Sequence, residues 1–269
     1  MVKKLLKHEL IAYSRVLLPM FAILLGVSLL TRFVAFFQNA STSYSIIEFS
    51  SWVALIVAMV VCLVMTEIFS VTRFYKNLFT HEGYLSFTLP VTPTQHIFTK
   101  LLVSLSFQIA AIIICAVSFS VATMGEVLFE VIKAGSYLIK EKMDLIGSHI
   151  IFYGLELFLC IITAIGTSML LFYTCIALGQ TFKKNRVLAA FGIYFAYYFI
   201  TQIIETVFML FFTGFSYLLP LDFIWEFLAE HPFASVHIIF CAILIFEIAL
   251  GALYYFITSL VIKKRLNLE

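Results

Sequence analysis

Four carboxylates stand inside long runs of apolar residues, where a charge is costly. They are Glu67, Glu156, Glu205 and Glu247. A charged group within a bilayer normally faces a bundle interior or water, so each is a candidate for substrate contact or proton transfer. Glu67 lies near the end of its run and could instead reach Arg73 or solvent.

Glu205 belongs to a polar stripe whose members recur at helical spacing on one face. The stripe consists of Tyr194, Tyr197, Tyr198, Thr201, Gln202 and Glu205. A helix that turned this face toward lipid would be destabilised, so we expect the stripe to be shielded from the bilayer. Two interpretations stay open: the stripe lines a transport pathway, or it hydrogen-bonds to another helix at a buried interface, such as that with a second copy of the chain.

Motifs of soluble catalysis are absent from the sequence. No HExxH, GxSxG or GxxxxGK[ST] motif occurs, so we expect neither a hydrolase nor a nucleotide-binding enzyme. The cysteines lack the spacing of metal ligands, and we expect them to be small packing residues. They are Cys62, Cys115, Cys160, Cys175 and Cys241. We therefore expect no metal or cofactor in this chain, and any ATP and Mg²⁺ would be bound by a partner protein.

The composition identifies the elements that must position these residues. Of the 269 residues, 63% are hydrophobic and 12% are charged, which is the balance of an integral membrane protein. A helix needs about 20 apolar residues to cross a bilayer. Six runs meet this requirement, near 16–37, 50–72, 98–124, 149–179, 187–212 and 235–262. The sequence thus predicts an all-α fold in which residues 1–269 form a single transmembrane domain.

The positive charges predict the orientation of the six spans. An even number of spans puts both termini on one side, and most of the 17 Lys and Arg residues fall on that side. They cluster at the N-terminus and in 73–100, 183–186 and 263–265. Because cytoplasmic loops are enriched in Lys and Arg, both termini are expected in the cytoplasm.

Two segments outside the six spans are predicted to associate with the membrane surface without crossing it. Residues 2–15 combine an apolar face with several lysines, which indicates an interfacial helix or, equally, a basic anchor for the first span. Residues 213–234 are apolar but interrupted by Gly214, Pro220 and acidic side chains. This second segment is too broken to span and is expected to dip into the outer leaflet as a re-entrant segment.

The polar insert after the second span predicts a compact elbow over residues 73–97. Its start, 73–80, continues the preceding helix, and 81–83 interrupts it. Thr92 and Gln95 then have the spacing of a capping box, with Pro93 at the first helical position. The insert also carries more apolar side chains than a solvated connector needs, so part of it should pack against another surface.

The insert also resembles a known family. The run YKNLFTHEGYLSFTLPVTPTQ, together with Lys4, Leu6, Lys7 and Glu9, resembles membrane permeases of bacterial type-2 ABC exporters, especially those of Gram-positive bacteria. The resemblance implies that two copies, or two related subunits, form the transmembrane unit and that a cytoplasmic ATPase drives each through a coupling helix after the second span. It assigns this coupling to Tyr75, Leu78, Phe79, Glu82, Gly83, Tyr84 and Leu85.

These observations favour a multi-pass permease of the bacterial plasma membrane that exports amphipathic or hydrophobic peptides, including toxins or antimicrobial peptides. A second hypothesis is a proton-coupled secondary transporter that uses Glu156, Glu205 or Glu247 as a relay. Such transporters often contain internal repeats, and the two halves of this chain do not repeat recognisably. A third hypothesis, a scaffold or sensor that transports nothing, would not need a polar stripe through the bilayer.

Overall fold

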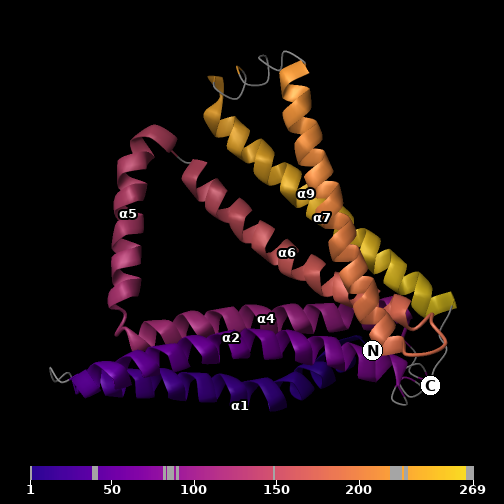
Figure 1. Ribbon diagram of the computed structural model, residues 1–269, viewed down its shortest axis with the longest axis horizontal. Coiled ribbons are helices and arrows are strands. Elements are labelled where there is room, and N and C mark those ends of the chain that lie inside the picture. Colours follow the sequence, from indigo (N-terminus) through magenta and orange to yellow (C-terminus); the bar gives the residue numbers. More distant parts are fainter. Residues whose placement is uncertain are drawn as a thin grey trace. The chain divides into compact units, whose positions relative to one another are not determined.

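Helices are the only regular secondary structure in the part of the chain that the structure describes. The computed structural model describes residues 2–37, 42–80, 83, 88, 91–147, 149–218, 226 and 230–264, and these form seven helices and no strand (Figure 1). The helices are α1 (Val2–Phe36), α2 (Thr42–Phe79), α4 (Pro93–Ala122), α5 (Glu126–Ile146), α6 (His149–Gly179), α7 (Arg186–Leu218) and α9 (Pro232–Lys264). All except α5 are long and apolar enough to cross a membrane, which confirms the prediction of six potential spans in an all-α membrane protein.

Helix α1 is longer than a bilayer requires. Its 35 residues correspond to a length of about 52 Å, against about 30 Å for a hydrocarbon core. The predicted interfacial segment 2–15 and the first span therefore form one continuous helix, with Pro19 inside it. The sequence offers no glycine before Gly26 at which the helix could end.

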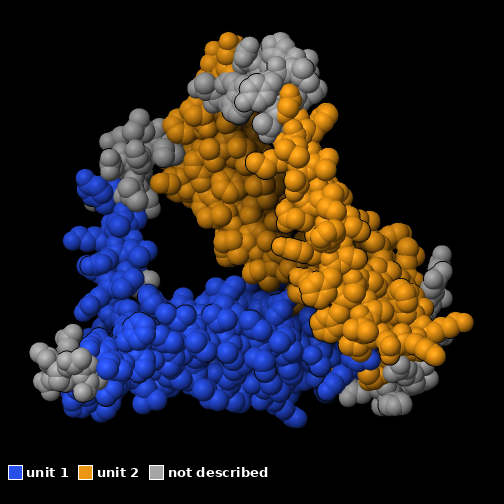
Figure 2. All heavy atoms as spheres, viewed as in Figure 1, with its two compact units in different colours: residues 1–76, 87–144 blue, residues 77–86, 145–269 orange. Residues whose placement is uncertain are grey.

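The chain divides into two compact units, which are described separately. Unit 1 comprises residues 1–76 and 87–144, and unit 2 comprises residues 77–86 and 145–269 (Figure 2). The division falls within the predicted elbow and at the end of α5. Each unit contains three of the potential membrane spans.

In unit 1, α1, α2 and α4 lie side by side (Figure 1). A stripe on α1 supplies one wall of the core, because residues spaced by three or four share a helix face. It consists of the buried Tyr13, Leu17, Phe21 and Leu24. The ring of Tyr13 packs between Phe69 of α2 and Phe107 of α4, at centroid distances of 5.1 Å and 5.2 Å. Aromatic and aliphatic packing therefore joins the three helices.

The start of α4 has the predicted capping box. Thr92 Oγ1 accepts a hydrogen bond from the Gln95 backbone N–H at 3.4 Å, and the Gln95 side-chain oxygen accepts one from the Thr92 N–H at 3.1 Å. Pro93 occupies the first turn, where its missing N–H costs nothing. The third span therefore begins at a fixed point, since the side chains satisfy backbone donors that a helix start leaves open.

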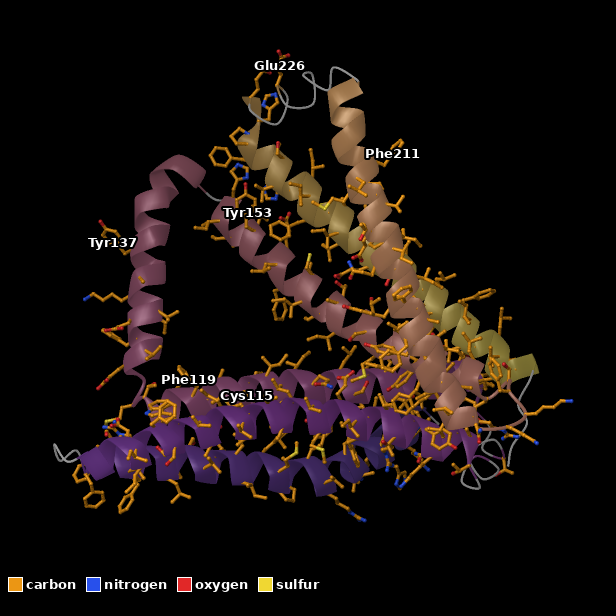
Figure 3. All side chains as sticks on the ribbon, viewed as in Figure 1. Cys115, Phe119, Tyr137, Tyr153, Phe211 and Glu226 are labelled. Carbon is orange, nitrogen blue, oxygen red and sulfur yellow. The ribbon has the colours of Figure 1, made fainter. Side chains whose placement is uncertain are left out.

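Helix α5 was not predicted from the sequence. It occupies part of the connection between the third and fourth spans, and it follows a turn in which Met124 and Gly125 have φ of 51° and 74°. Its described side chains in 126–127 and 129–137 are largely exposed, and Tyr137 points away from the helix (Figure 3). Charged residues lower the hydropathy of α5 without lowering its helix propensity, so a search for apolar runs passes over it.

In unit 2, α6 and α9 pack along their length, while α7 meets α6 at the turn that joins them. From this turn α6 and α7 separate (Figure 1). Helix α7 continues to Leu218 and α9 begins at Pro232, so both ends of the predicted re-entrant segment 213–234 belong to long helices. Residues 219–225 and 227–229, in the middle of that segment, lie outside the described residues.

Candidate functional site

A buried ion cluster joins the three long helices of unit 1. The carboxylate of Glu9 on α1 accepts hydrogen bonds from Arg73 Nε on α2 and from Lys100 Nζ on α4, both at 2.7 Å. The side chains of Glu9 and Lys100 are only 6% and 4% exposed. The Arg73 guanidinium also lies 5.8 Å from the centroid of the Tyr13 ring. We call Glu9, Arg73 and Lys100 the Glu9 cluster.

The Glu9 cluster fixes the start of α1 against the end of α2 and the start of α4. Removing Glu9 would leave two cations near each other, one of them buried, so the carboxylate is the member on which the arrangement depends. This pairing was not predicted from the sequence, where Arg73 and Lys100 served as orientation charges and Arg73 was considered as a partner of Glu67. A signal was present: Glu9 lies four residues before Tyr13, on the helix face that continues through Leu17 into the core.

Glu67 has a different partner from those considered above. It accepts a hydrogen bond from the Gln108 side chain of α4, and its other oxygen is buried without a partner among the described residues. Arg73 instead pairs with Glu9. Glu67 therefore contributes to the contact between α2 and α4 inside unit 1.

The residues assigned to ATPase coupling differ in their accessibility. Leu78, Phe79 and Gly83 are buried, whereas Tyr75 is half-buried. Glu82, Tyr84 and Leu85 lie outside the described residues. A docking surface needs side chains that a partner can reach, and the nearby Lys76 and Thr88 are exposed. Any contact that a partner makes with the described part of the elbow would therefore involve Tyr75, Lys76 or Thr88 more directly than Leu78.

A line of polar contacts follows the interface between α6 and α9. At one end, His149 Nδ1 lies 3.0 Å from His237 Nε2, and His237 Nδ1 lies 2.7 Å from Glu156 Oε1. A neutral His237 can donate to Glu156 and accept from His149 at the same time. Tyr153 is beside them and donates to the Phe233 carbonyl at 3.0 Å (Figure 3).

The same interface remains polar farther along the helices. Thr163 donates to the Glu247 carboxylate, and Thr167 donates to the Glu247 carbonyl at 3.2 Å. Near the other end, the hydroxyls of Thr174 and Thr258 lie 2.9 Å apart. The pairs run in the same order on both helices, so α6 and α9 are parallel, as the fourth and sixth spans of an alternating six-span chain must be. We call this interface the α6–α9 seam.

An open groove of about 740 Å³ lies among α6, α7 and α9. Its polar lining residues are Thr167 and Ser168 of α6, Tyr197 of α7, and Glu247 and Tyr254 of α9. Phe208 and Phe246 add aromatic surface, and the other lining residues are alanines, leucines and an isoleucine. The hydroxyls of Tyr197 and Tyr254 are hydrogen-bonded to each other, with ring centroids 6.0 Å apart. The groove thus combines a mainly apolar wall with a few grouped polar atoms.

Comparison with known proteins adds no family to this geometry. A scan of protein-family models and searches of curated proteins and of solved structures found no match to the chain.

The side chains of the polar stripe of α7 form two groups, one packed against other helices of unit 2 and one exposed. Tyr194 stacks on Phe172 of α6 at 5.2 Å, and Tyr197 reaches Tyr254 in the groove. Thr201 is half-buried and donates to a carbonyl of its own helix. In contrast, Tyr198, Gln202 and Glu205 are exposed. Only part of the stripe contributes to the packing of unit 2, and the expectation that the rest is shielded from lipid stays a prediction.

The four intramembrane carboxylates are also distributed unevenly. Glu156 and Glu247 both lie on the α6–α9 seam, and Glu247 also lines the groove. Glu205 projects from α7 without contributing to either feature. Cys160, Ala164 and Ser168 are spaced by four residues on α6, but Cys160 faces α9 whereas Ala164 and Ser168 line the groove.

Proposed function

We propose that this chain is the membrane-spanning permease subunit of a bacterial ATP-driven exporter of the type-2 ABC class. Its substrates are amphipathic or hydrophobic peptides, such as toxins or antimicrobial peptides. The single observation that carries the proposal is the groove of unit 2, whose apolar wall and grouped hydroxyls suit a solute that is itself partly apolar. A pathway for small hydrated ions would need far more polar lining.

Energy for export comes from a partner in this proposal. The sequence has no P-loop, so a cytoplasmic ABC ATPase supplies the ATP and Mg²⁺ chemistry. Its force enters through the elbow at the end of α2, close in sequence to Arg73 of the Glu9 cluster. A second permease copy or a paralogue completes the transmembrane unit and covers Tyr198, Gln202 and Glu205. Both termini lie in the cytoplasm, according to the distribution of Lys and Arg.

The accessible part of the elbow supplies the test of ATPase binding. We expect the double substitution Tyr75→Glu, Lys76→Glu to lower the recovery of an ATP-hydrolysing partner at least about tenfold, because about 1.4 kcal/mol of lost binding energy suffices for that change. The measurement is affinity purification from native membranes, with peptide sequencing of the partner for a P-loop. ATP hydrolysis of the purified complex is measured in parallel.

A matched control comes from α5, where Tyr137 and Lys133 are exposed. Tyr137→Glu, Lys133→Glu makes the same chemical change on the side of the membrane expected to face outward, and it should leave the complex intact. Thermal unfolding of both variants shows whether either has lost its fold. Absence of a P-loop partner from the wild-type complex, or equal loss in the two variants, would refute the assignment.

The α6–α9 seam supports a second candidate function, proton-coupled secondary transport. His149, His237 and Glu156 form a continuous hydrogen-bonded chain, and Glu156 Oε2 is buried without a partner among the described residues. Histidine and carboxylate groups in series can pass a proton. This arrangement favours Glu156 over Glu205 as the first residue of a relay.

The two functions predict opposite results in proteoliposomes that contain this chain alone. We expect a proton gradient to drive no uptake of a labelled amphipathic peptide, because the ATPase is absent. If a gradient does drive uptake, and Glu156→Gln reduces it at least tenfold, the secondary transporter is the correct function. The exposed Glu230 on the segment before α9 provides the control substitution, Glu230→Gln.

A further inference from the structure

The described lining residues of the groove in unit 2 include one acidic side chain and no basic one. Among its described lining residues, Glu247 is the only Asp, Glu, Lys or Arg. Thr163 donates one hydrogen bond to the Glu247 carboxylate, and no Lys, Arg or His of the described chain pairs with it. A carboxylate in a membrane helix is costly unless a cation or strong donors compensate it. The groove therefore lacks a positive group opposite Glu247.

Aromatic rings line the same groove. Tyr254 lies two turns after Glu247 on α9, a rise of about 10 Å, and its hydroxyl bonds to that of Tyr197. The rings of Tyr197 and Tyr254 are nearly perpendicular, at 81°, so they present both a face and an edge. Phe246 adjoins Glu247 in sequence, and Phe208 extends the aromatic wall from α7. Aromatic faces attract organic cations, and the attraction strengthens where water is excluded.

The remaining wall is apolar, and the volume of about 740 Å³ falls within the range of sites for drug-sized ligands. Because a cation would complement the negative charge of Glu247, we infer that the groove is a binding site for an amphipathic organic cation. Its ammonium or guanidinium group lies at Glu247, and its apolar body lies along Phe208, Phe246 and the aliphatic wall. A lysine or arginine side chain within a hydrophobic peptide has this chemistry. The inference rests on the proposed function, because it specifies which amphipathic substrates the permease selects.

Binding can be measured without an ATPase. The chain is reconstituted in nanodiscs of zwitterionic phosphatidylcholine, and fluorescence anisotropy follows rhodamine 6G, a lipophilic cation, with the signal of empty nanodiscs subtracted. Glu247→Gln is expected to weaken rhodamine 6G binding at least about tenfold, because hydrogen bonds and contacts to charged groups contribute more than neutral ones. Binding of Nile red, a neutral apolar dye, should change less than about twofold.

Two further variants control for loss of fold and for surface charge. Glu230→Gln removes one negative charge from an exposed position outside the groove and should leave both affinities unchanged. Ser168→Trp places a bulky ring in the groove from the exposed face of α6 while keeping Glu247, and it should reduce the binding of both dyes. If Glu247→Gln does not fold, loss of rhodamine 6G binding in Ser168→Trp, with Glu230→Gln unaffected, still supports the site.

Several outcomes would overturn the inference. They are unchanged rhodamine 6G affinity in Glu247→Gln, an equal effect of Glu230→Gln, and unaltered binding in Ser168→Trp. A lipid acyl chain as the natural occupant would appear as equal binding of neutral and cationic dyes in the wild type. The inference and the proposed function can fail independently. If binding depends on Glu247 but the chain recruits no ATPase, the binding site is supported and the ABC assignment is rejected.

Discussion

Replacing Glu9 with Gln should lower the free energy of unfolding by about 3 kcal/mol, the scale of losing one member of a buried ion pair. The isosteric amide keeps the shape of the side chain but removes the negative charge that Lys100, whose side chain is 4% exposed, pairs with at 2.7 Å. Arg73 is 26% exposed on its side chain and can partly recover its solvation, so most of the loss comes from Lys100. Thermal unfolding of the purified protein in detergent measures the change.

A double variant separates this mechanism from a general loss of packing. Glu9→Gln combined with Lys100→Met removes the buried ammonium group together with its carboxylate partner, and it should recover much of the stability that Glu9→Gln loses. Glu126→Gln on the exposed start of α5 is the control for removal of a carboxylate and should change stability by less than about 0.5 kcal/mol. If the double variant is less stable than the single one, the ion cluster does not work as described.

Gly179→Ala should disrupt the packing of α6 against α7, and we expect it to destabilise unit 2 by about 1–3 kcal/mol. A Cβ atom at this position would lie 2.7 Å from Ala190 Cβ and 2.8 Å from both the Ala190 nitrogen and the Arg186 carbonyl oxygen. Two of these are backbone atoms that cannot rotate away. The turn between α6 and α7 would have to open, which would alter the angle at which α7 borders the groove.

Gly154 supplies the matched control on the same helix. A Cβ there meets nothing within 4 Å, so Gly154→Ala should be neutral, or stabilise α6 by up to about 1 kcal/mol through its higher helix propensity. The two variants are compared by thermal unfolding and by rhodamine 6G binding to the groove. Equal stability of Gly179→Ala and Gly154→Ala would show that α6 and α7 do not meet closely at residue 179.

The sequence by itself determined the class of the molecule. Long apolar runs can satisfy their backbone hydrogen bonds in a bilayer only as helices, and their number and approximate positions follow from length and hydropathy. Thr92, Pro93 and Gln95 determined the start of α4, because a capping box is local and depends on residues within four positions of each other. A local feature such as this capping box can be predicted from the sequence without knowing which helices are neighbours.

The tertiary structure decided which candidates act together. Glu9 and Lys100 are 91 residues apart and Thr163 and Glu247 are 84 apart, so no spacing rule could pair them. The stripe of α7 looked uniform in sequence, but packing against α6 and α9 turned Tyr194 and Tyr197 inward and left Gln202 and Glu205 exposed. Periodicity tells which residues share a helix face, whereas only the neighbouring helices determine whether a carboxylate there meets a cation, a hydroxyl or an open groove.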